Sequence, residues 1–355
     1  NYWMHNGHIR VNEEKMSKSL GNSPDPIDLI NQYGADGVRV GILISSPAGN
    51  DLPFDSSQCE QGRNFTNKIW NAYRLVSSWE VREIEQPLSS KVAIEWFENR
   101  FAQVLKEIND NFDKFRISDA LMSTYKLVWD DFCSWYLEMI KPGYQQPIDS
   151  ATLEQTLDFF ERILKIMLPF TPFVAEELYH ALRERQAGDD IVIAQWPVSQ
   201  EVDTMPLQQF AFNEKVITQI RNIRKQNNIA TKIKLELFIK ADASRAHAAD
   251  SILIKMGNLS LLQYVEEKVS QANSFIVDGI EFFVPFGEQI DLEAEKKKLE
   301  EEIIYTQGFL KSVQAKLQNQ KFMAGAPDAV VANERKKEAD ALAKMAILEE
   351  KLGSL

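Results

Sequence analysis

Apolar residues recur every three or four positions along much of the chain, which is the spacing of one face of an α-helix. The signal is strongest between residues 58 and 227, where three long stripes follow one another. The stripes consist of Phe97, Phe101, Val104, Leu105, Ile108 and Phe112, then Leu121, Tyr125, Val128, Phe132, Trp135 and Met139, and then Leu153, Leu157, Phe160, Leu164 and Met167. Because each helix must cover its apolar face with other helices, we expect a bundle in this region.

Two local signals predict where helices of this bundle begin. Thr152 and Gln155 have the spacing of a capping box, in which two side chains satisfy free N–H groups at a helix start. Thr171 precedes Pro172, as an N-cap residue precedes a proline in the first helical position.

The pattern changes near residue 231 and predicts a small α/β module over residues 231–290. Residues 233–239 alternate apolar and polar, which is typical of a half-buried strand. Residues 250–268 have a helical pattern. The Asp278-Gly279 pair between two apolar runs, 275–277 and 280–286, predicts a β-hairpin.

The two ends of the chain differ from this middle part. Residues 1–57 are rich in loop signals, with a turn cluster at 22–26 and a short helix expected over 27–32 that stops near Gly34. The tail, residues 291–355, has one stripe at Leu292, Leu299, Ile303, Leu310, Val313 and Leu317, and a second at Ala339, Leu342, Met345, Leu348 and Leu352.

The sequence Gly325-Ala326-Pro327 separates the two stripes of the tail, so we expect the segment to fold back as an antiparallel coiled coil of roughly 45 Å. A regular seam also suits dimerisation, but the central break favours a hairpin within one chain, and we expect a monomer. The predicted fold is therefore mainly α, with a helical bundle, a small α/β module and a C-terminal coiled-coil hairpin.

Composition narrows the class of protein. A chain of 355 residues suggests two or three domains, and 44% hydrophobic with 26% charged residues is typical of a globular protein. The sequence has no signal peptide and no apolar run of membrane-spanning length, so we expect a cytoplasmic protein without membrane contacts.

Cys59 and Cys133 are far apart, which indicates neither a disulfide framework nor a zinc site, and we expect both to be buried. His180 and His247 show no partners at ligand spacing, so no metal site is expected.

The formal net charge of −12 argues against a uniformly basic nucleic-acid binder, but a large acidic protein can carry local basic faces. One short stretch contains several side chains that could bind phosphate. It consists of Lys15, Met16, Ser17, Lys18 and Ser19, followed by Leu20-Gly21-Asn22. Two ammonium groups and two hydroxyls before a glycine suit a loop that neutralises charge developing on phosphates. The alternative is a solvated basic turn.

The Lys15–Ser19 stretch resembles the second signature of class I aminoacyl-tRNA synthetases. Further segments resemble the members for valine, isoleucine and leucine, and several resemble the valine-specific subgroup in particular. These segments are 26–28, 33–39, 47–51, 54–55, 62–65, 67–72, 169–172, 175–178 and 195–197. Isoleucine-specific members commonly end in a cysteine-rich zinc module, which two distant cysteines do not form. The alternatives are an isoleucine-specific member and a non-catalytic tRNA-binding protein.

The resemblance implies a function for each region. Residues 1–57 would be the end of the catalytic domain, in which Lys15 and Lys18 stabilise the pyrophosphate of ATP bound with Mg²⁺ and all five residues 15–19 contact the nucleotide. Residues 58–230 would bind the anticodon stem, 231–290 would connect, and 291–355 would be a tRNA-binding arm. The whole protein would activate valine and transfer it to tRNA(Val).

The same resemblance implies that much of the family's machinery lies outside this sequence. The first signature of the family is His-x-Gly-His, and His5-Asn6-Gly7-His8 lies too close to the lysine–serine loop to be that signature. The editing domain is not found here, and Glu13 and Glu14 stand where many relatives have glycine before the first signature lysine. We therefore expect the chain to correspond to a C-terminal part of the enzyme, inactive by itself.

Candidate tRNA contacts lie on two faces. On a helix over residues 60–79, with about 100° per residue, one side is apolar and the other carries Arg63, Asn67, Trp70, Asn71 and Arg74, which suits phosphates and unstacked bases. The alternative is that this side packs on a neighbouring domain and buries Trp70.

The arm carries the second set, Lys316, Lys321, Arg335, Lys336 and Lys337, which the resemblance places against the outer corner of the tRNA. The alternative is an ordinary charged coiled-coil surface. A further basic run, Arg221, Arg224, Lys225, Lys232 and Lys234, is interpreted as a solvated face more readily than as a phosphate contact.

Overall fold

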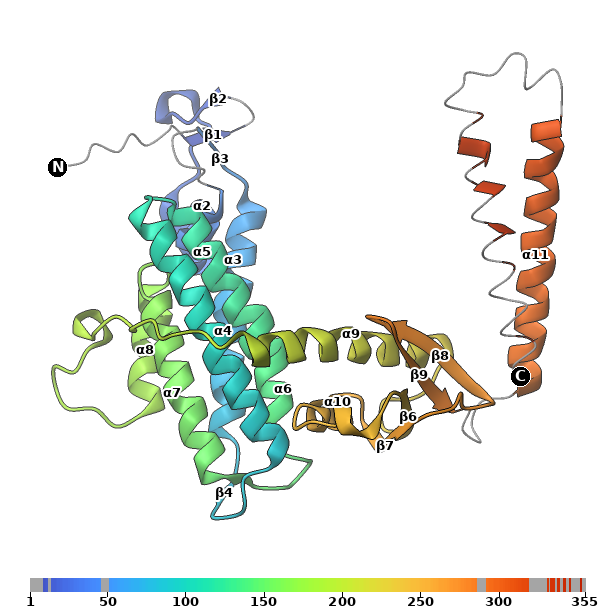
Figure 1. The fold of residues 1–355 in the computed structure, drawn as a ribbon. Helices are drawn as coiled ribbons and strands as arrows, with labels where there is room; N and C mark the ends of the chain where they lie inside the picture. The colour runs from blue at the N-terminus through green and yellow to red at the C-terminus, as the bar shows by residue number, and fades with distance from the viewer. Residues whose placement is uncertain are drawn as a thin grey trace. The chain divides into compact units, whose positions relative to one another are not determined.

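The computed structural model describes residues 9–11, 14–45, 51–285 and 292–318, together with residues 331, 333–335, 337–338, 341–342, 345 and 352. The chain forms two compact units, Asn1–Asn213 and Glu214–Leu355. Helices dominate both units, and strands are few and short (Figure 1). Within the described ranges, no helix combines the length and the apolarity needed to cross a membrane.

The first unit begins with three short strands, β1 (Ile9–Val11), β2 (Glu14–Lys15) and β3 (Leu52–Pro53), which form one small sheet. Strand β1 pairs antiparallel with β2 and parallel with β3. Helix α1 (Pro26–Tyr33) confirms the short helix expected from the sequence, and it ends at Gly34, whose φ of +76° suits glycine. Helix α2 (Ala35–Ile44), by contrast, was not predicted in this loop-rich segment.

The rest of the first unit is the predicted helical bundle (Figure 1). Its elements are α3 (Ser56–Ser77), α4 (Leu88–Asp113), α5 (Ile117–Lys126), the π-helix η2 (Leu127–Tyr136), α6 (Leu137–Ile140), α7 (Ser150–Met167), α8 (Pro172–Leu182) and the 3-10 helix η3 (Ile191–Ile193). Strands β4 (Val81–Arg82) and β5 (Ile148–Asp149) pair in parallel at one end. Helix α9 (Thr204–Gln226) runs from the first unit into the second.

Aromatic rings form the centre of the bundle. Phe97 on α4 contacts Phe132, Tyr136 and Phe159 with ring centroids 4.9–5.4 Å apart, and all four side chains are buried. The Tyr136 hydroxyl lies 2.9 Å from the Thr156 hydroxyl, so the polar end of this buried ring is satisfied. The predicted stripes therefore converge on one core.

Two details of α7 differ from the sequence interpretation. The helix is capped by Asp149, whose carboxylate accepts a hydrogen bond from the Thr152 N–H at 2.7 Å, so the predicted capping box at Thr152 and Gln155 is wrong. In the first turns, Thr152 and Thr156 are buried in place of the half-buried Leu153 and Leu157. The threonine hydroxyls fit there because both have hydrogen-bond partners.

The second unit contains a four-stranded sheet in the order β7-β6-β9-β8. Strands β6 (Leu235–Lys240), β8 (Ala272–Val277) and β9 (Ile280–Pro285) confirm the expected strand and hairpin, and the turn residues Asp278 and Gly279 have φ of +47° and +81°. The helix expected over 250–268 is wrong beyond its start, because α10 (Asp250–Met256) gives way to strand β7 (Leu259–Val265). Strand β7 pairs in parallel with β6.

The arm begins with α11 (Leu292–Gln318), in which Thr306, Leu310 and Val313 are buried. The first predicted seam is thus confirmed over the part whose side chains the structure describes. On the returning segment Ala341 is buried, whereas Leu342 keeps 49% of its surface exposed. The buried position is therefore one residue before the predicted stripe residue Leu342.

Two opposite charges on α2 hold the turn between α7 and α8. The Asp36 carboxylate accepts hydrogen bonds from the Val174 and Phe173 N–H groups at 2.7 and 3.3 Å, at the start of α8. One turn later, the Arg39 guanidinium donates to the carbonyls of Pro169 and Phe170 at 3.0 and 3.1 Å. Asp36 thus caps a helix more than 130 residues away in sequence, and we call this set of contacts the α2 clamp.

Glycine lets α2 and α3 approach to backbone contact. A Cβ atom added at Gly41 would lie 2.6 Å from the backbone nitrogen of Cys59, and one added at Gly62 would lie 2.2 Å from the carbonyl oxygen of Gly37. Neither position has room for a side chain, because the obstructing atoms belong to the backbone.

We predict that Gly41→Ala destabilises the first unit by about 1–3 kcal/mol, because α2 must move away from α3 to admit the methyl group. Urea unfolding followed by circular dichroism measures this change. Gly308→Ala on α11 is the control, since its Cβ would meet nothing within 4 Å. The control should be neutral or gain up to about 1 kcal/mol, and equal effects of both variants would contradict the tight contact.

We also predict that Asp36→Ala lowers the free energy of unfolding by about 1–3 kcal/mol, because two N–H groups at the start of α8 lose their acceptor. The same unfolding measurement applies. Asp113→Ala, at an exposed site, should stay within about 0.5 kcal/mol of the parent chain. Parent-like stability of the Asp36 variant would show that the clamp contributes little.

Candidate functional site

The Lys15–Asn22 loop is closed by a side chain. The Asn22 side-chain oxygen accepts from the Ser17 N–H at 2.8 Å, and its amide nitrogen donates to the Lys15 carbonyl at 3.2 Å. The 3-10 helix η1 (Lys18–Leu20) and Gly21 lie between Ser17 and Asn22 in the sequence. The φ of +68° at Gly21 turns the chain back toward the start of the loop. Asn22 therefore sets the shape of the loop, which sequence reasoning did not assign to it.

The predicted phosphate-binding groups stand on this loop. Lys15, at the end of β2, is exposed to solvent. The hydroxyls of Ser17 and Ser19 lie 2.7 Å apart and hydrogen-bond to each other, and Met16 is anchored through its N–H to the Ile9 carbonyl. The backbone of Lys18 is part of η1, while its side chain lies outside the described residues. The loop thus presents an exposed ammonium group and a hydroxyl pair on a backbone fixed by β1.

Helix α3 shows two faces, as its sequence predicts. Phe65, Ile69, Ala72 and Val76 are buried on one side. On the other side Asn67, Trp70, Asn71 and Arg74 are exposed, and Arg63 is partly exposed. Trp70 keeps 37% of its surface accessible, so the alternative in which this face buries the indole is not seen in the described part of the chain.

Part of this face opens into a pocket of about 220 Å³. Asn67 and Trp70 line it from α3, Tyr33 from the end of α1, and Phe173 and Val174 from the start of α8. Phe173 is 65% exposed, and the Arg63 guanidinium lies 5.8 Å from the centre of the Tyr33 ring. Aromatic rings beside an amide and a cation are groups that bind an unstacked base.

Two candidate residues of the arm are paired with an acidic side chain. Lys316 and Lys337 both lie beside the Glu334 carboxylate, at 3.8 and 2.7 Å, and Glu334 is only 6% exposed. Two of the expected phosphate contacts therefore neutralise a buried carboxylate. Arg335 is exposed, and Lys321 and Lys336 lie outside the described residues.

Arg224 of the basic run has a structural role. It is 8% exposed, and its guanidinium donates to the carbonyls of Ala230, Ile233, Gly257 and Asn258 at 2.8–3.3 Å. Arg224 is therefore not part of a solvated face.

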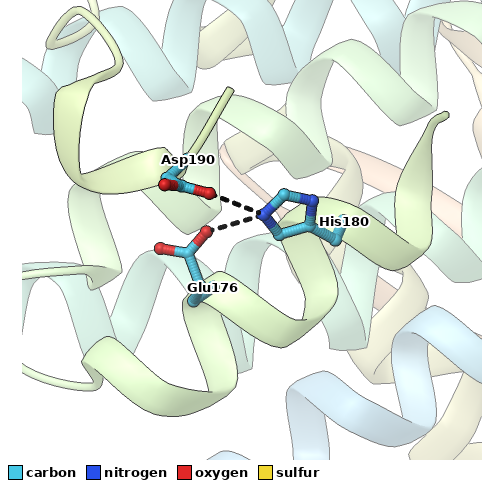
Figure 2. A group of neighbouring side chains, drawn as sticks. All are labelled: Glu176, His180 and Asp190. Carbon is cyan, nitrogen blue, oxygen red and sulfur yellow. Dashed lines mark hydrogen bonds and ion pairs between the residues drawn. The ribbon is translucent and has the colours of Figure 1, made fainter. Parts of the chain in front are cut away.

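The structure corrects the interpretation of the histidines. His180 has two partners at its Nε2 atom, Glu176 at 2.9 Å and Asp190 at 3.4 Å (Figure 2). Glu176 lies one helical turn before His180, a spacing that the sequence displays, while Asp190 returns from a later segment. His247 pairs with Asp250 at 3.1 Å. Cys59 and Cys133 are buried as expected, and burial raises the pKa of Cys133 to about 12.

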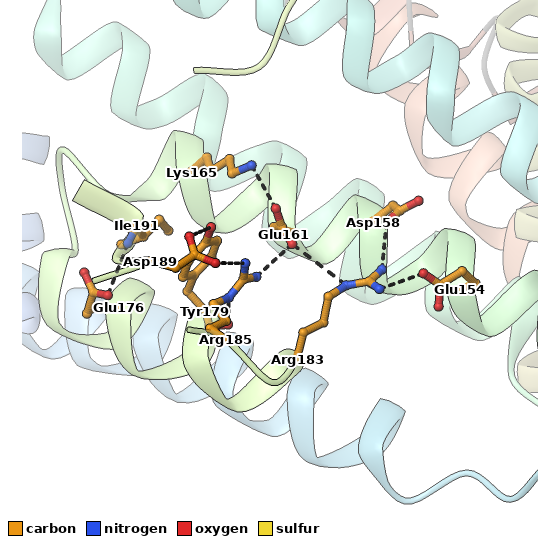
Figure 3. Close-up of polar contacts among 10 residues, drawn as sticks. All are labelled: Glu154, Asp158, Glu161, Lys165, Glu176, Tyr179, Arg183, Arg185, Asp189 and Ile191. Atoms are coloured by element: carbon orange, nitrogen blue, oxygen red, sulfur yellow. Dashed lines mark hydrogen bonds and ion pairs between the residues drawn. The ribbon is translucent and has the colours of Figure 1, made fainter. Parts of the chain in front are cut away.

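The segment that carries Asp190 is tied to α7 and α8 by charged side chains (Figure 3). The Arg185 guanidinium lies 3.2 Å from the Tyr179 ring centre and donates to Glu161 at 2.8 Å. Lys165 donates to the same carboxylate at 2.8 Å. Burial by itself raises the pKa of Glu161, but the hydrogen bonds and charges of Lys165 and Arg185 outweigh it and hold the pKa below its usual value.

The lowered pKa of Glu161 predicts a pH-dependent contribution to stability. A carboxyl whose pKa is lower in the folded state stabilises the fold above its unfolded pKa, and this contribution is lost as the pH falls through the folded value. We expect Glu161→Gln to lower the free energy of unfolding by about 1–2 kcal/mol at neutral pH. The difference from the parent chain should shrink below the ordinary Glu value of 4.5. Urea unfolding between pH 3 and 7 measures it, and a difference that persists unchanged at the acid end would contradict this assignment.

Comparisons with known proteins match three parts of the chain. Residues 1–64 match the class I (C) catalytic domain of tRNA synthetases, residues 95–239 the anticodon-binding domain of tRNA ligase, and residues 291–355 the tRNA binding arm of valyl tRNA synthetase.

Curated relatives match almost the whole chain. The valine–tRNA ligase of Christiangramia forsetii is 52% identical over 342 residues and that of Parabacteroides distasonis 50% identical, in each case over 96% of this chain and 39% of the relative. The enzyme of Bacillus thuringiensis subsp. konkukian is 35% identical over 358 residues. A solved leucyl enzyme–tRNA complex from Agrobacterium radiobacter K84 has a TM-score of 0.39 and 17% identity, over 66% of this chain and 25% of that one.

The chain spans about 39% of the length of the first two of these relatives, so it corresponds to a part of them. The matched regions agree with the geometry: a closed lysine–serine loop, a helical bundle with an exposed polar face, and a helical arm. The chain belongs to the valine–tRNA ligase family of class I aminoacyl-tRNA synthetases.

Proposed function

We propose that this chain is the C-terminal part of a valine–tRNA ligase and supplies its second signature loop and its tRNA-binding elements. The whole protein would activate valine with ATP and Mg²⁺ and then esterify tRNA(Val). The observation that carries the proposal is the α2 clamp. It fixes the segment after the lysine–serine loop to the turn between α7 and α8, within the region that matches an anticodon-binding domain.

Lys15 and Lys18 act on the pyrophosphate in this proposal. Negative charge grows on the leaving pyrophosphate during adenylate formation, and a fixed ammonium group stabilises that charge more than it stabilises the ground state. The Asn22 side chain supports this by binding the backbone on both sides of Met16, at the Lys15 carbonyl and the Ser17 N–H. Met16, Ser17 and Ser19 contact the nucleotide from the same loop.

The polar face of α3 contacts tRNA in this proposal. Arg63 and Arg74 pair with phosphates, Asn67 and Asn71 read base edges, and Trp70 stacks on a base, supported by the pocket beside it. In the arm, the side chains of Arg335 and Lys316 are exposed. Lys316, Lys321, Lys336 and Lys337 remain proposed contacts, and phosphate would compete with Glu334 for Lys316 and Lys337.

Four regions divide this work in the proposal. Residues 1–57 complete the catalytic domain, 58–230 bind the anticodon stem, 231–290 connect, and 291–355 form the arm. The chain acts as a monomer in the cytoplasm, and it forms no valyl-adenylate without the rest of the enzyme. Detectable valine-dependent ATP–pyrophosphate exchange by the purified chain would refute that last statement.

The test is binding of the purified chain to tRNA(Val) and tRNA(Ile) across a salt series. We expect preference for tRNA(Val), with affinity falling linearly on a logarithmic salt scale because phosphate contacts release counterions. Trp70→Ala should weaken binding by about 1–3 kcal/mol with little change in salt slope. Arg74→Ala should weaken it and reduce the slope by about one.

Lys91→Ala is the matched control, because Lys91 is an exposed cation that belongs to α4 and not to the polar face of α3. It should leave both affinity and slope unchanged. Preference for tRNA(Ile) would assign the chain to the isoleucine-specific enzymes. Equal losses from Trp70, Arg74 and Lys91 variants would show non-specific attraction and refute the proposed face.

A further inference from the structure

Three potential metal ligands converge on one point at the end of α8. Glu176 and His180 lie one turn apart on the same face of the helix, and Asp190 precedes η3 (Figure 2). One ligand atom from each lies within 4.8 Å of the others. We propose that Glu176, His180 and Asp190 bind a divalent transition-metal ion, for which Zn²⁺ is the best match.

The arrangement is poorly explained by hydrogen bonds alone. The Nε2 atom of an imidazole carries at most one hydrogen, yet two carboxylate oxygens face it, at 2.9 and 3.4 Å. One hydrogen shared between both oxygens makes two weaker, poorly aligned bonds, and the two carboxylates repel each other. A cation between the three groups satisfies both oxygens and the imidazole lone pair together.

Nearby basic side chains do not neutralise these carboxylates. Arg185 is bound to Glu161, Asp189 and the Tyr179 carbonyl. Arg183 pairs with Glu154 and Asp158, which lie on α7 (Figure 3). Among the residues that the structure describes, neither Glu176 nor Asp190 forms an ion pair with lysine or arginine.

The donor set selects the class of metal. One imidazole nitrogen and two carboxylate oxygens are Zn²⁺ ligands, with bonds of about 2.0–2.2 Å, and a tetrahedral ion of that size separates its ligands by roughly 3.3 Å. The observed separations of 2.9 and 3.4 Å from Nε2 are close to that value. Mg²⁺ prefers oxygen ligands in an octahedral shell, so it should bind much more weakly. His180 is exposed, which leaves room for water as a fourth ligand.

The scaffold around the site is already in place. The buried Ile191 donates its N–H to Glu176 Oε1 at 3.2 Å, which fixes the chain next to Asp190. On its other side, Asp189 contacts the Tyr179 hydroxyl at 3.3 Å and Arg185 at 3.5 Å. A bound ion would thus join α8 to the segment that leads away from it, and the residues on either side of Asp190 are already held in place by these contacts.

Isothermal titration calorimetry of the purified 355-residue chain with Zn²⁺, and separately with Mg²⁺, tests the proposal. We expect one Zn²⁺ site that Mg²⁺ does not compete for. His180→Ala should weaken Zn²⁺ binding about 100-fold or more, because it removes a direct ligand. Glu176→Gln should weaken it at least about tenfold while keeping the acceptor for the Ile191 N–H, so the local fold is preserved.

Three controls separate this site from other effects. Glu177→Gln, next to the site on α8, should bind Zn²⁺ like the parent chain. Replacing His5 and His8 by alanine removes two of the four histidines and should leave the site intact. Unfolding of each variant without metal checks the fold. No binding to the parent chain at millimolar Zn²⁺, or parent-like affinity of the His180 and Glu176 variants, would overturn the proposal.

Discussion

The contact on which the first unit depends is a pair of opposite charges on one short helix. Asp36 holds the N–H groups that begin α8, and Arg39 holds the carbonyls just before them. Burial raises the pKa of Asp36, although the two N–H donors and Arg39 lower it, so the carboxylate is kept at a cost in desolvation. That cost is offset because the N–H groups at the start of α8 and the carbonyls of Pro169 and Phe170 all gain hydrogen-bond partners.

The α2 clamp also explains why a lysine–serine loop and a helical bundle form one unit. Residues 1–64 and 95–239 match different domains, but α2 packs on α3 through glycines and reaches α8 through Asp36. The loop therefore continues into a helix whose position is fixed on two sides. A change in the bundle near α8 and a change near the loop act on the same short element, α2.

Much of the fold was predictable because the bundle helices are long and strongly periodic. The stripes through Phe97 and Phe132 were predicted correctly, and so were the second half of the stripe through Phe160 and the hairpin at Asp278-Gly279. The failures have physical causes. Helix α2 was missed because Gly37 and Gly41 suggest breaks in sequence, whereas here they permit backbone contact. Residues 259–265 were read as helix because a short apolar run is ambiguous until its neighbour β6 is known.

The candidate sites were predictable only in part. Helical geometry alone separated the buried and exposed faces of α3, including Trp70. The closure of the loop by Asn22 and the pairing of Lys316 and Lys337 with Glu334 depend on which side chains meet after folding. The same holds for His180: its spacing from Glu176 was visible, but Asp190 reaches it only because Arg185 and Ile191 bring the chain back.

The hydrogen bonds of Arg224 determine which nearby residues of the second unit tolerate substitution. Its guanidinium binds only main-chain carbonyls in the four hydrogen bonds described, so the side chains at residues 230, 233, 257 and 258 play no part in them. Ala230 and Ile233 can change identity without removing an acceptor, whereas lysine cannot replace Arg224, because it lacks a planar fork that serves several oxygens at once. Gly257 and Asn258 are constrained for other reasons: a Cβ at Gly257 would lie 2.7 Å from the Leu253 carbonyl oxygen, and Asn258 has a φ of +49° and donates its side-chain amide to the carbonyls of Thr231 and Ile233. Mutational tolerance at the Arg224 contact is therefore one-sided only for Ala230 and Ile233, where any residue supplies the main-chain acceptor but a single side chain supplies the donors.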